Sequence, residues 1–242
     1  MQQPIILQDL GLIAYKAAWD YQFEVQRRII AIKTKLREAN AYPPQNTPAS
    51  EGLGHFLFCE HLPVYTLGKT GKKEHLLLSE AELAARGIDF YAINRGGDIT
   101  FHGIGQVVGY PIFDLELFSP DVWRYVRQVE EAAIRVCSDY GVTAHRIEGE
   151  SGAWLLNSDG AAARKICAVG IHLSRWVTMH GFAFNVNTDL SYFKHIIPCG
   201  ITDKGVTSLE QELGYRVSEA DVKKRFLKHY TDLFDVLFVN FD

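Results

Sequence analysis

Apolar residues recur at helical spacing in three parts of this chain. They cover residues 12–38, 122–136 and 222–233, and each segment carries one apolar face. Asp121 precedes the second segment and Gly141 follows it, as is typical of a helix start and a helix end. We therefore predict three helices, the first of them the longest.

Short runs rich in β-branched and aromatic residues fill the space between these helices. Glycines separate many of them, as is typical of strands joined by tight turns. The predicted strands are residues 55–60, 64–67, 90–94, 99–102 and 107–113, and a second strand-rich block covers 145–188. This order predicts an α+β fold, a mixed β-sheet flanked by helices. The proline-rich stretch 40–53 is interpreted as a loop, so we expect a single domain over residues 1–242.

The composition and charge of the chain are those of a globular protein and argue against several other classes. With 242 residues, 47% of them hydrophobic and 22% charged, the chain can bury a substantial core. The formal net charge of −4 argues against a nucleic-acid-binding protein, which normally has a basic face. The N-terminus lacks the features of a signal peptide, and no apolar run reaches the roughly 20 residues that span a bilayer.

The four cysteines are scattered along the chain and form no CxxC pair. Without an export signal, disulfides are not expected. We therefore predict a cytoplasmic protein with reduced thiols and no membrane association.

The segment Arg95-Gly-Gly-Asp-Ile-Thr-Phe-His102 is the first candidate site. Its adjacent glycines let the backbone approach a ligand closely because no Cβ intervenes. Arg95 and His102 can supply hydrogen-bond donors on either side. The alternative is a tight turn whose glycines serve only the backbone.

The second segment, Arg164 to His172, places Lys165 at the start of an apolar strand. A buried lysine can act chemically, whereas an edge-strand lysine simply reaches water, and the segment alone favours the latter. Cys167 alternates with apolar residues and is interpreted as a small core residue.

The third segment runs from His180 to Ile201. Cys199 lies between Pro198 and Gly200, which favour a turn, so its thiol is more accessible than a core thiol and is the candidate nucleophile. An inert, half-buried thiol is the alternative.

The chain also contains residues of the types that bind zinc. The possible ligands are Cys167, His172, His180, His195 and Cys199. Their spacing resembles no closed four-ligand site, so we predict no metal.

Together these segments resemble the lipoyl(octanoyl) transferase family. The resemblance rests on Arg95-Gly-Gly-Asp-Ile-Thr-Phe-His102, Lys165-Ile-Cys-Ala-Val-Gly170, His180-Gly-Phe-Ala-Phe-Asn-Val-Asn187 and Ile197-Pro-Cys-Gly-Ile201. They occur in the family's order and at compatible separations, within roughly residues 50–210.

The resemblance implies the fold of the lipoate- and biotin-ligase catalytic domains. It implies that Cys199 carries the acyl group and that Lys165 activates this cysteine. The residues that match the acyl pocket are Arg95, Gly96, Gly97, Asp98, Ile99, Thr100, Phe101, His102, Ala168, Val169, Gly170, Gly181, Phe182 and Ala183. For the oxyanion, we consider a backbone N–H near Gly200 or Gly170, and the His102 side chain.

The implied reaction is the first step of lipoate cofactor synthesis. Octanoyl-acyl carrier protein is the implied donor, and the implied acceptors are lysines of the lipoyl domains of 2-oxoacid dehydrogenases and of the glycine cleavage H protein. Because the donor is already a thioester, no ATP and no cofactor are expected. Whether Lys165 acts as an ammonium ion or as a general base stays open.

Three alternatives stay open beside this prediction: an ATP-dependent lipoate ligase on the same fold, a non-catalytic acyl-binding module, and a cysteine hydrolase. Two basic clusters are candidate docking surfaces for acidic partners. One consists of Lys69, Lys72 and Lys73, and the other of Arg146, Arg164 and Arg175. The roles of the 40–53 loop and the 157–164 hairpin stay open.

Overall fold

A large mixed sheet forms the centre of the computed structural model, which describes residues 2–44, 53–157, 163–197 and 205–240. The order of its strands is β12 (Val236–Asn240), β1 (Gln3–Ile13), β2 (Gly54–His61), β6 (Gln106–Phe113), β10 (Val177–Asn185), β9 (Ala163–Ser174), β8 (Glu150–Leu156) and β7 (His145–Ile147). Strand β1 is parallel to both β12 and β2, and a short strand, β11 (Gly205–Val206), lies parallel to β9. The remaining neighbours are antiparallel.

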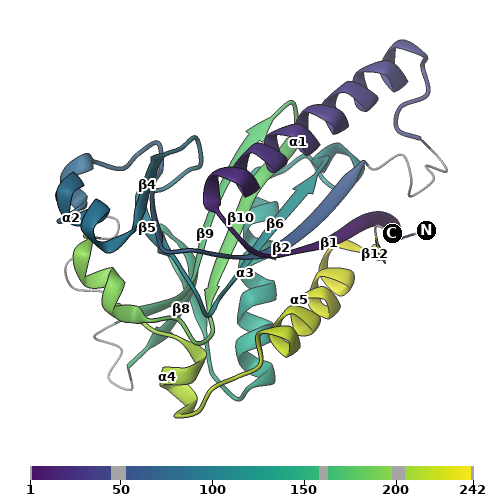
Figure 1. The fold of residues 1–242 in the computed structure, drawn as a ribbon. Coiled ribbons are helices and arrows are strands. Elements are labelled where there is room, and N and C mark those ends of the chain that lie inside the picture. The colour runs from purple at the N-terminus through teal and green to yellow at the C-terminus, as the bar shows by residue number, and fades with distance from the viewer. Residues whose placement is uncertain (1, 45–52, 158–162, 198–204, 241–242) are drawn as a thin grey trace.

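A second, smaller sheet stands beside the large one (Figure 1). Its order is β4 (Asp89–Ala92), β3 (Val64–Leu67) and β5 (Ile99–His102), with helix α2 (Glu80–Arg86) packed next to it. Ser79 begins α2 with a capping box: its hydroxyl accepts from the N–H of Glu82, whose carboxylate accepts from the Ser79 N–H. Gly87 ends the helix in the left-handed region.

Helices cover both faces of the large sheet (Figure 1). Helix α1 (Tyr15–Glu38) packs on one face, over β2, β6 and β10. Helices α3 (Val122–Asp139) and α5 (Glu219–Phe234) pack on the other face and bury the larger core cluster. The shorter helices are α4 (Leu209–Leu213) and the 3₁₀ turns η2 (Lys73–His75), η3 (Leu115–Leu117) and η4 (Leu190–His195).

The predicted mixed sheet with flanking helices is confirmed, as are the three long helices. Asp121 caps α3 by accepting from the Arg124 N–H at 3.0 Å. Strands β1 and β12 were not predicted. Each strand buries only part of its residues, so neither shows a regular alternation of apolar and polar positions. The two strands also pair with each other although they lie at opposite ends of the sequence.

Within the described residues, no helix is both long enough and apolar enough to cross a membrane. Part of the proline-rich loop, residues 45–52, lies outside the described residues.

Candidate active site

A pocket lies between the small sheet and the β9–β10 part of the large sheet. Its empty space, including the open mouth, is about 980 Å³. The pocket therefore sits where the two sheets meet, and residues from both contribute to its walls.

The floor is made of very small residues on two adjacent strands. Ala168 on β9 pairs with Ala183 on β10, and Gly170 pairs with Gly181 two positions further along. All four line the pocket. Because side chains on one face of a sheet alternate with those on the other, these four residues leave a shallow apolar channel along β9 and β10.

The roof comes from the segment Arg95–His102. The Arg95 guanidinium donates to the carbonyl and hydroxyl oxygens of Thr66, at 2.7 and 3.0 Å. The Gly96 N–H donates to the carbonyl of Ile171 over 2.8 Å, which joins the roof to β9. A Cβ on Gly170 would lie 3.0 Å from the Gly96 carbonyl oxygen and 3.1 Å from Cδ of Arg95. The channel is therefore covered at Gly170.

A chain of buried hydrogen bonds lies behind the pocket wall. The Asn185 amide donates to the Thr207 carbonyl at 3.0 Å, and the Gln106 amide donates to Asn185 Oδ1 at 2.9 Å. Gln106 Oε1 in turn accepts from His102 Nδ1 at 2.9 Å. Since Gln106 Oε1 can only accept, the proton of the His102 ring must sit on Nδ1.

His102 is therefore a neutral ring whose Nε2 carries no proton. Burial lowers the pKa of His102 well below its ordinary value, and the nearby His61 lowers it further. Nε2 lies 3.4 Å from the Thr66 hydroxyl. The hypothesis that the His102 side chain donates to an oxyanion is not supported, because its one N–H is already bonded to Gln106.

Two more histidines near this wall are kept neutral by burial. The pKa of His61 is lowered to about 4 and that of His180 to about 3, in both cases mainly by desolvation. The wall is thus rich in polar atoms but carries no histidine charge at neutral pH. Arg95, Asp98 and Lys165 are the residues of the wall with ordinarily charged side chains.

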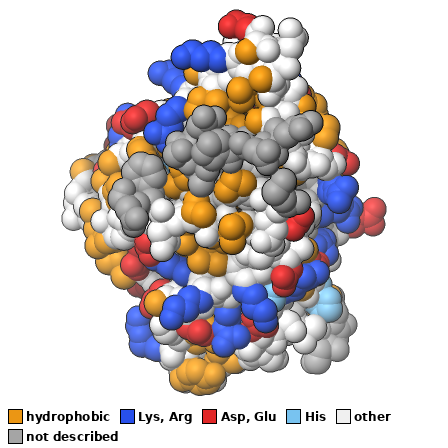
Figure 2. Space-filling view, turned by 90° about the vertical axis from the view of Figure 1, so that its right-hand side faces the viewer, with side chains coloured by type: hydrophobic (Ala, Val, Ile, Leu, Met, Phe, Trp, Pro, Cys, Tyr) orange, Lys and Arg blue, Asp and Glu red, His pale blue; other side chains and the backbone are white. Residues whose placement is uncertain are grey.

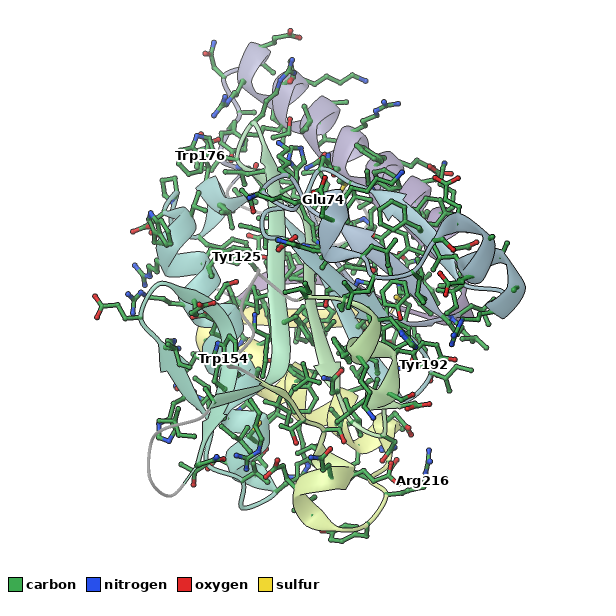
Figure 3. The ribbon with its side chains drawn as sticks, turned by 90° about the vertical axis from the view of Figure 1, so that its left-hand side faces the viewer. Glu74, Tyr125, Trp154, Trp176, Tyr192 and Arg216 are labelled. Carbon is green, nitrogen blue, oxygen red and sulfur yellow. The ribbon has the colours of Figure 1, made fainter. Side chains whose placement is uncertain are left out.

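Lys165 lies in the pocket wall on β9. This strand is between β10 and β8, so the alternative of an edge-strand lysine is wrong. Trp154 lies on β8, to one side of the long strands β9 and β10 (Figure 3). The Lys165 Nζ lies 4.4 Å from the centroid of the Trp154 ring. On the other side, Val206 of β11 pairs with Lys165, and the Thr207 N–H donates to the Lys165 carbonyl over 3.0 Å.

Cys199 falls outside the described residues, which stop at Ile197 and resume at Gly205. The described residues on each side of this gap border the site, since Phe193 and Gly205 both line the pocket. The other cysteines, Cys59, Cys137 and Cys167, are buried free thiols. Cys167 is 0% exposed and belongs to the core, as predicted.

Of the residues predicted to line the acyl pocket, the structure brings all but Gly96 and Phe101 to its surface. Gly96 acts through its backbone bond to β9. Phe101 packs in a separate cluster, where its ring stacks on Tyr192 at 4.4 Å. Because side chains alternate along β5, Phe101 lies on the strand face opposite Thr100 and His102.

Several lining residues were not predicted from the sequence: Tyr15, Gln106, Tyr110, Trp154 and Asn185. Asn185 lies inside one of the recognised motifs and Trp154 in a predicted strand. Tyr15 begins a helix far away in the sequence. Nothing local to Tyr15 indicates that its ring stacks on His102, at 5.7 Å between centroids.

The two basic clusters differ in the structure. Arg146 and Arg164 are bound to carboxylates of this chain, Arg164 with two 2.7 Å bonds to Glu212. By contrast, Lys69 and Lys72 are exposed. Lys69 also adjoins the pocket roof, because its N–H donates to the Arg95 carbonyl. Within the described residues, no group of three or more His, Cys, Asp or Glu is arranged to hold a metal ion.

Comparison with known proteins matches residues 38–231 to the lipoyl protein ligase A/B catalytic domain. An octanoyltransferase of Flavobacterium psychrophilum is 53% identical over 97% of this chain and 98% of its own length. One of Cytophaga hutchinsonii is 52% identical over 96% and 93%, respectively. The fold is shared with the bipartite lipoate protein ligase of Thermoplasma acidophilum. That structure covers this chain completely and aligns over 88% of its own, with a TM-score of 0.65 at 14% identity.

Proposed function

The chain belongs to the octanoyltransferases of the lipoyl protein ligase A/B catalytic-domain family, acyltransferases of lipoate biosynthesis, and we propose that it carries the octanoyl group as a thioester on Cys199. The observation that best supports this is the position of Lys165. It lies in the pocket wall, and the chain that resumes after the Cys199 segment is hydrogen-bonded to it. An amine thus stands beside Val206 and Thr207, with which the described chain continues after the candidate nucleophile.

The reaction joins an acyl donor to a lysine of a lipoyl domain. For this chain the proposed donor is octanoyl-acyl carrier protein, and the proposed acceptors are the lipoyl domains of 2-oxoacid dehydrogenases and the glycine cleavage H protein. Attack by the Cys199 thiolate forms one thioester and breaks another, releasing the carrier thiol. The acceptor amine then attacks the acyl-enzyme, forms an amide and releases Cys199. No ATP or cofactor is needed, since the donor is already activated.

The small-residue floor is the proposed binding site of the octanoyl chain. It extends from Lys165 past Ala168 to Gly170, where Arg95 and Gly96 cover it. Each methylene buried there contributes about 0.8 kcal/mol. Gly170 lies five residues beyond Lys165, about 16 Å along the strand. That separation favours Gly200, rather than Gly170, as the proposed oxyanion donor.

Docking of an acidic donor is proposed at Lys69 and Lys72. Both lysines are exposed and Lys69 adjoins the pocket roof, whereas Arg146 and Arg164 form ion pairs within the chain. Figure 2 shows a face turned away from the small sheet, where Lys and Arg side chains are interspersed with Asp and Glu. The mixed charges of that face should attract an acidic partner less strongly than the exposed lysines beside the pocket do.

The cytoplasm is the proposed compartment. Thiols stay reduced in the cytosol, where disulfides are rare. The three described cysteines are free, which is consistent with such conditions.

Intact mass measurement after incubation with octanoyl-acyl carrier protein, without ATP, tests the proposed function. One octanoyl adduct is expected, and peptide mapping should place it on the peptide that contains Cys199. A requirement for ATP would support the lipoate ligase instead. Rapid release of free octanoate without an acceptor would support the hydrolase, and the absence of any turnover would support a binding module.

Replacing Lys165 by alanine should slow acylation about 100-fold at pH 7, with partial recovery as the pH rises toward 9. An unassisted thiol has a pKa near 8.5 and is only a few per cent thiolate at neutral pH. Raising the pH deprotonates the thiol without help from the amine, so the rate of acylation recovers. Single-turnover mass spectrometry measures the rate. Lys228→Ala, an exposed lysine on α5, is the matched control. The same defect at every pH would mean that Lys165 binds substrate rather than activating the thiol.

Replacing Ala168 by leucine should shorten the acyl chain that the enzyme accepts. The larger side chain fills the channel above the Ala168–Ala183 pair. Excluding about four methylenes removes roughly 3 kcal/mol, so acylation by octanoyl donors should fall about 100-fold relative to butyryl donors. Competition between the two donors measures this ratio. Ala85→Leu, on the exposed side of α2, should leave the ratio unchanged.

A further inference from the structure

One side of the pocket is closed by buried aromatic residues that the proposed mechanism does not use. Tyr15 of α1, His102 of β5 and Tyr110 of β6 line this side, and each is at most 7% exposed. Across the β9–β10 pair, Ser151 of β8 lines the pocket and is exposed, as is Gly205 of β11. The pocket therefore opens toward β8 and β11 and has its inner end at Tyr15.

The Tyr15 ring is held where the two sheets meet. Tyr15 begins α1, whose N-terminal end lies between the small sheet and the large sheet (Figure 1). The ring stacks on His102 and on Tyr91, with centroids 5.7 and 5.8 Å apart, and meets His61 edge-on at 5.1 Å. Because Tyr15 is only 2% exposed and lines the pocket, water reaches its hydroxyl through the pocket.

The hydroxyls of Tyr15 and Tyr110 differ in their hydrogen bonds. His61 Nδ1 donates to the Ile13 carbonyl at 2.9 Å, so His61 Nε2 carries no proton and accepts from the Tyr110 hydroxyl at 2.8 Å. By contrast, the Tyr15 hydroxyl has no hydrogen-bond partner in the part of the chain that the structure describes. A buried hydroxyl without a protein partner depends on water for its hydrogen bonds.

The Tyr15 hydroxyl also lies at the end of the apolar channel. Burial raises the pKa of Tyr15 above its ordinary value, and the nearby Arg95 guanidinium lowers it. The hydroxyl is therefore protonated at neutral pH and lies within electrostatic reach of Arg95, which covers the channel at Gly170. An apolar chain that follows the small-residue floor to its end meets a polar group there.

We propose that Tyr15 is a specificity-determining residue, whose hydroxyl limits the length of the acyl chain that the pocket accepts. The inference rests on the proposed function in taking a carrier-bound acyl chain as the substrate. Such a chain enters with its methyl end first, because the carrier protein is too large to follow it. The methyl end therefore points toward the inner end of the pocket.

Two opposing effects set the preferred length. Each methylene that the pocket buries tightens binding about fourfold. A methylene that reaches the Tyr15 hydroxyl displaces water from it and offers no hydrogen bond in return, which weakens binding about tenfold. Lengthening the chain therefore tightens binding only until the chain meets this hydroxyl.

Binding of unreactive acyl amides to the full chain tests this without acyl transfer. The probes are the N-hydroxyethyl amides of octanoic and decanoic acid, and calorimetric titration measures their Kd values. In the wild type, the decanoyl amide should bind no more tightly than the octanoyl amide. In Tyr15→Phe, which keeps the ring and removes the hydroxyl, the decanoyl amide should bind about tenfold more tightly, since two more methylenes are buried without the loss of a hydrogen bond.

Tyr230→Phe is the matched control. The Tyr230 hydroxyl is also buried without a partner among the described residues, but it lies in the core between α5 and the sheet, away from the pocket lining. This variant should keep the wild-type ratio of Kd values. An unchanged ratio in Tyr15→Phe, or an equal change in Tyr230→Phe, would overturn the proposal. The absence of an octanoyl adduct in the intact mass experiment would instead count against the proposed function, because amide binding involves no acyl transfer.

Discussion

Replacing Cys199 by alanine should abolish the octanoyl adduct and slow transfer to a lipoyl-domain lysine by about 10³-fold or more. Without the thiol, the acceptor amine must attack the donor directly, with both proteins docked at once. A loss of this size corresponds to at least about 4 kcal/mol of transition-state stabilisation. Intact mass spectrometry measures the adduct, and a gel-shift or mass assay of the lipoyl domain measures transfer.

Cys167→Ala is the control for this prediction. Cys167 is 0% exposed, and burial raises the pKa of its thiol well above the ordinary value. It packs in the core cluster beneath α3 and α5. We expect Cys167→Ala to keep the adduct and to lose only stability. An adduct that survives in Cys199→Ala but disappears in Cys167→Ala would reverse the assignment of the nucleophile.

The second large effect concerns stability. Asp114 is 0% exposed and accepts from the Lys33 Nζ at 2.7 Å and from the Tyr42 hydroxyl at 2.8 Å. Lys33, which is 3% exposed, also donates to the Arg175 carbonyl at 2.9 Å. This network links α1 to the end of β6 and to the β9–β10 turn.

Asp114→Ala should therefore lower the free energy of unfolding by about 3 kcal/mol, because it removes the fully buried one of the two carboxylates that pair with the Lys33 ammonium and leaves only the partly exposed Glu116. Urea unfolding, followed by circular dichroism, measures the change. The double variant Lys33→Met with Asp114→Leu should be less destabilised than Asp114→Ala, since it removes both charges together.

Asp20→Ala provides the exposed comparison. Asp20 pairs with Lys16 at 2.6 Å, but both side chains are more than half exposed. Its loss should cost less than about 1 kcal/mol. Equal destabilisation by Asp20→Ala and Asp114→Ala would show that burial is not what makes the Asp114 network important.

The sequence could predict those parts of the fold in which each segment carries its own pattern. Helices α1, α3 and α5 bury one face against a sheet, so their apolar residues repeat at helical spacing. Strands β2, β3, β5 and β6 are bounded by glycines or turn residues and match the predicted runs closely. Linked motifs, rather than any single residue, predicted the family and most of the pocket lining.

Only the tertiary structure determines the features that depend on contacts between segments far apart in the sequence. The pairing of β1 with β12, the stacking of Tyr15 on His102 and the closing of the channel by Arg95 over Gly170 join residues that share no local pattern. The same holds for the protonation of His102, which is fixed by burial and by Gln106. The spacing of apolar residues indicates the secondary structure of a segment and which of its faces is buried. The charge state of a side chain and the shape of a pocket depend on which distant segments pack against one another.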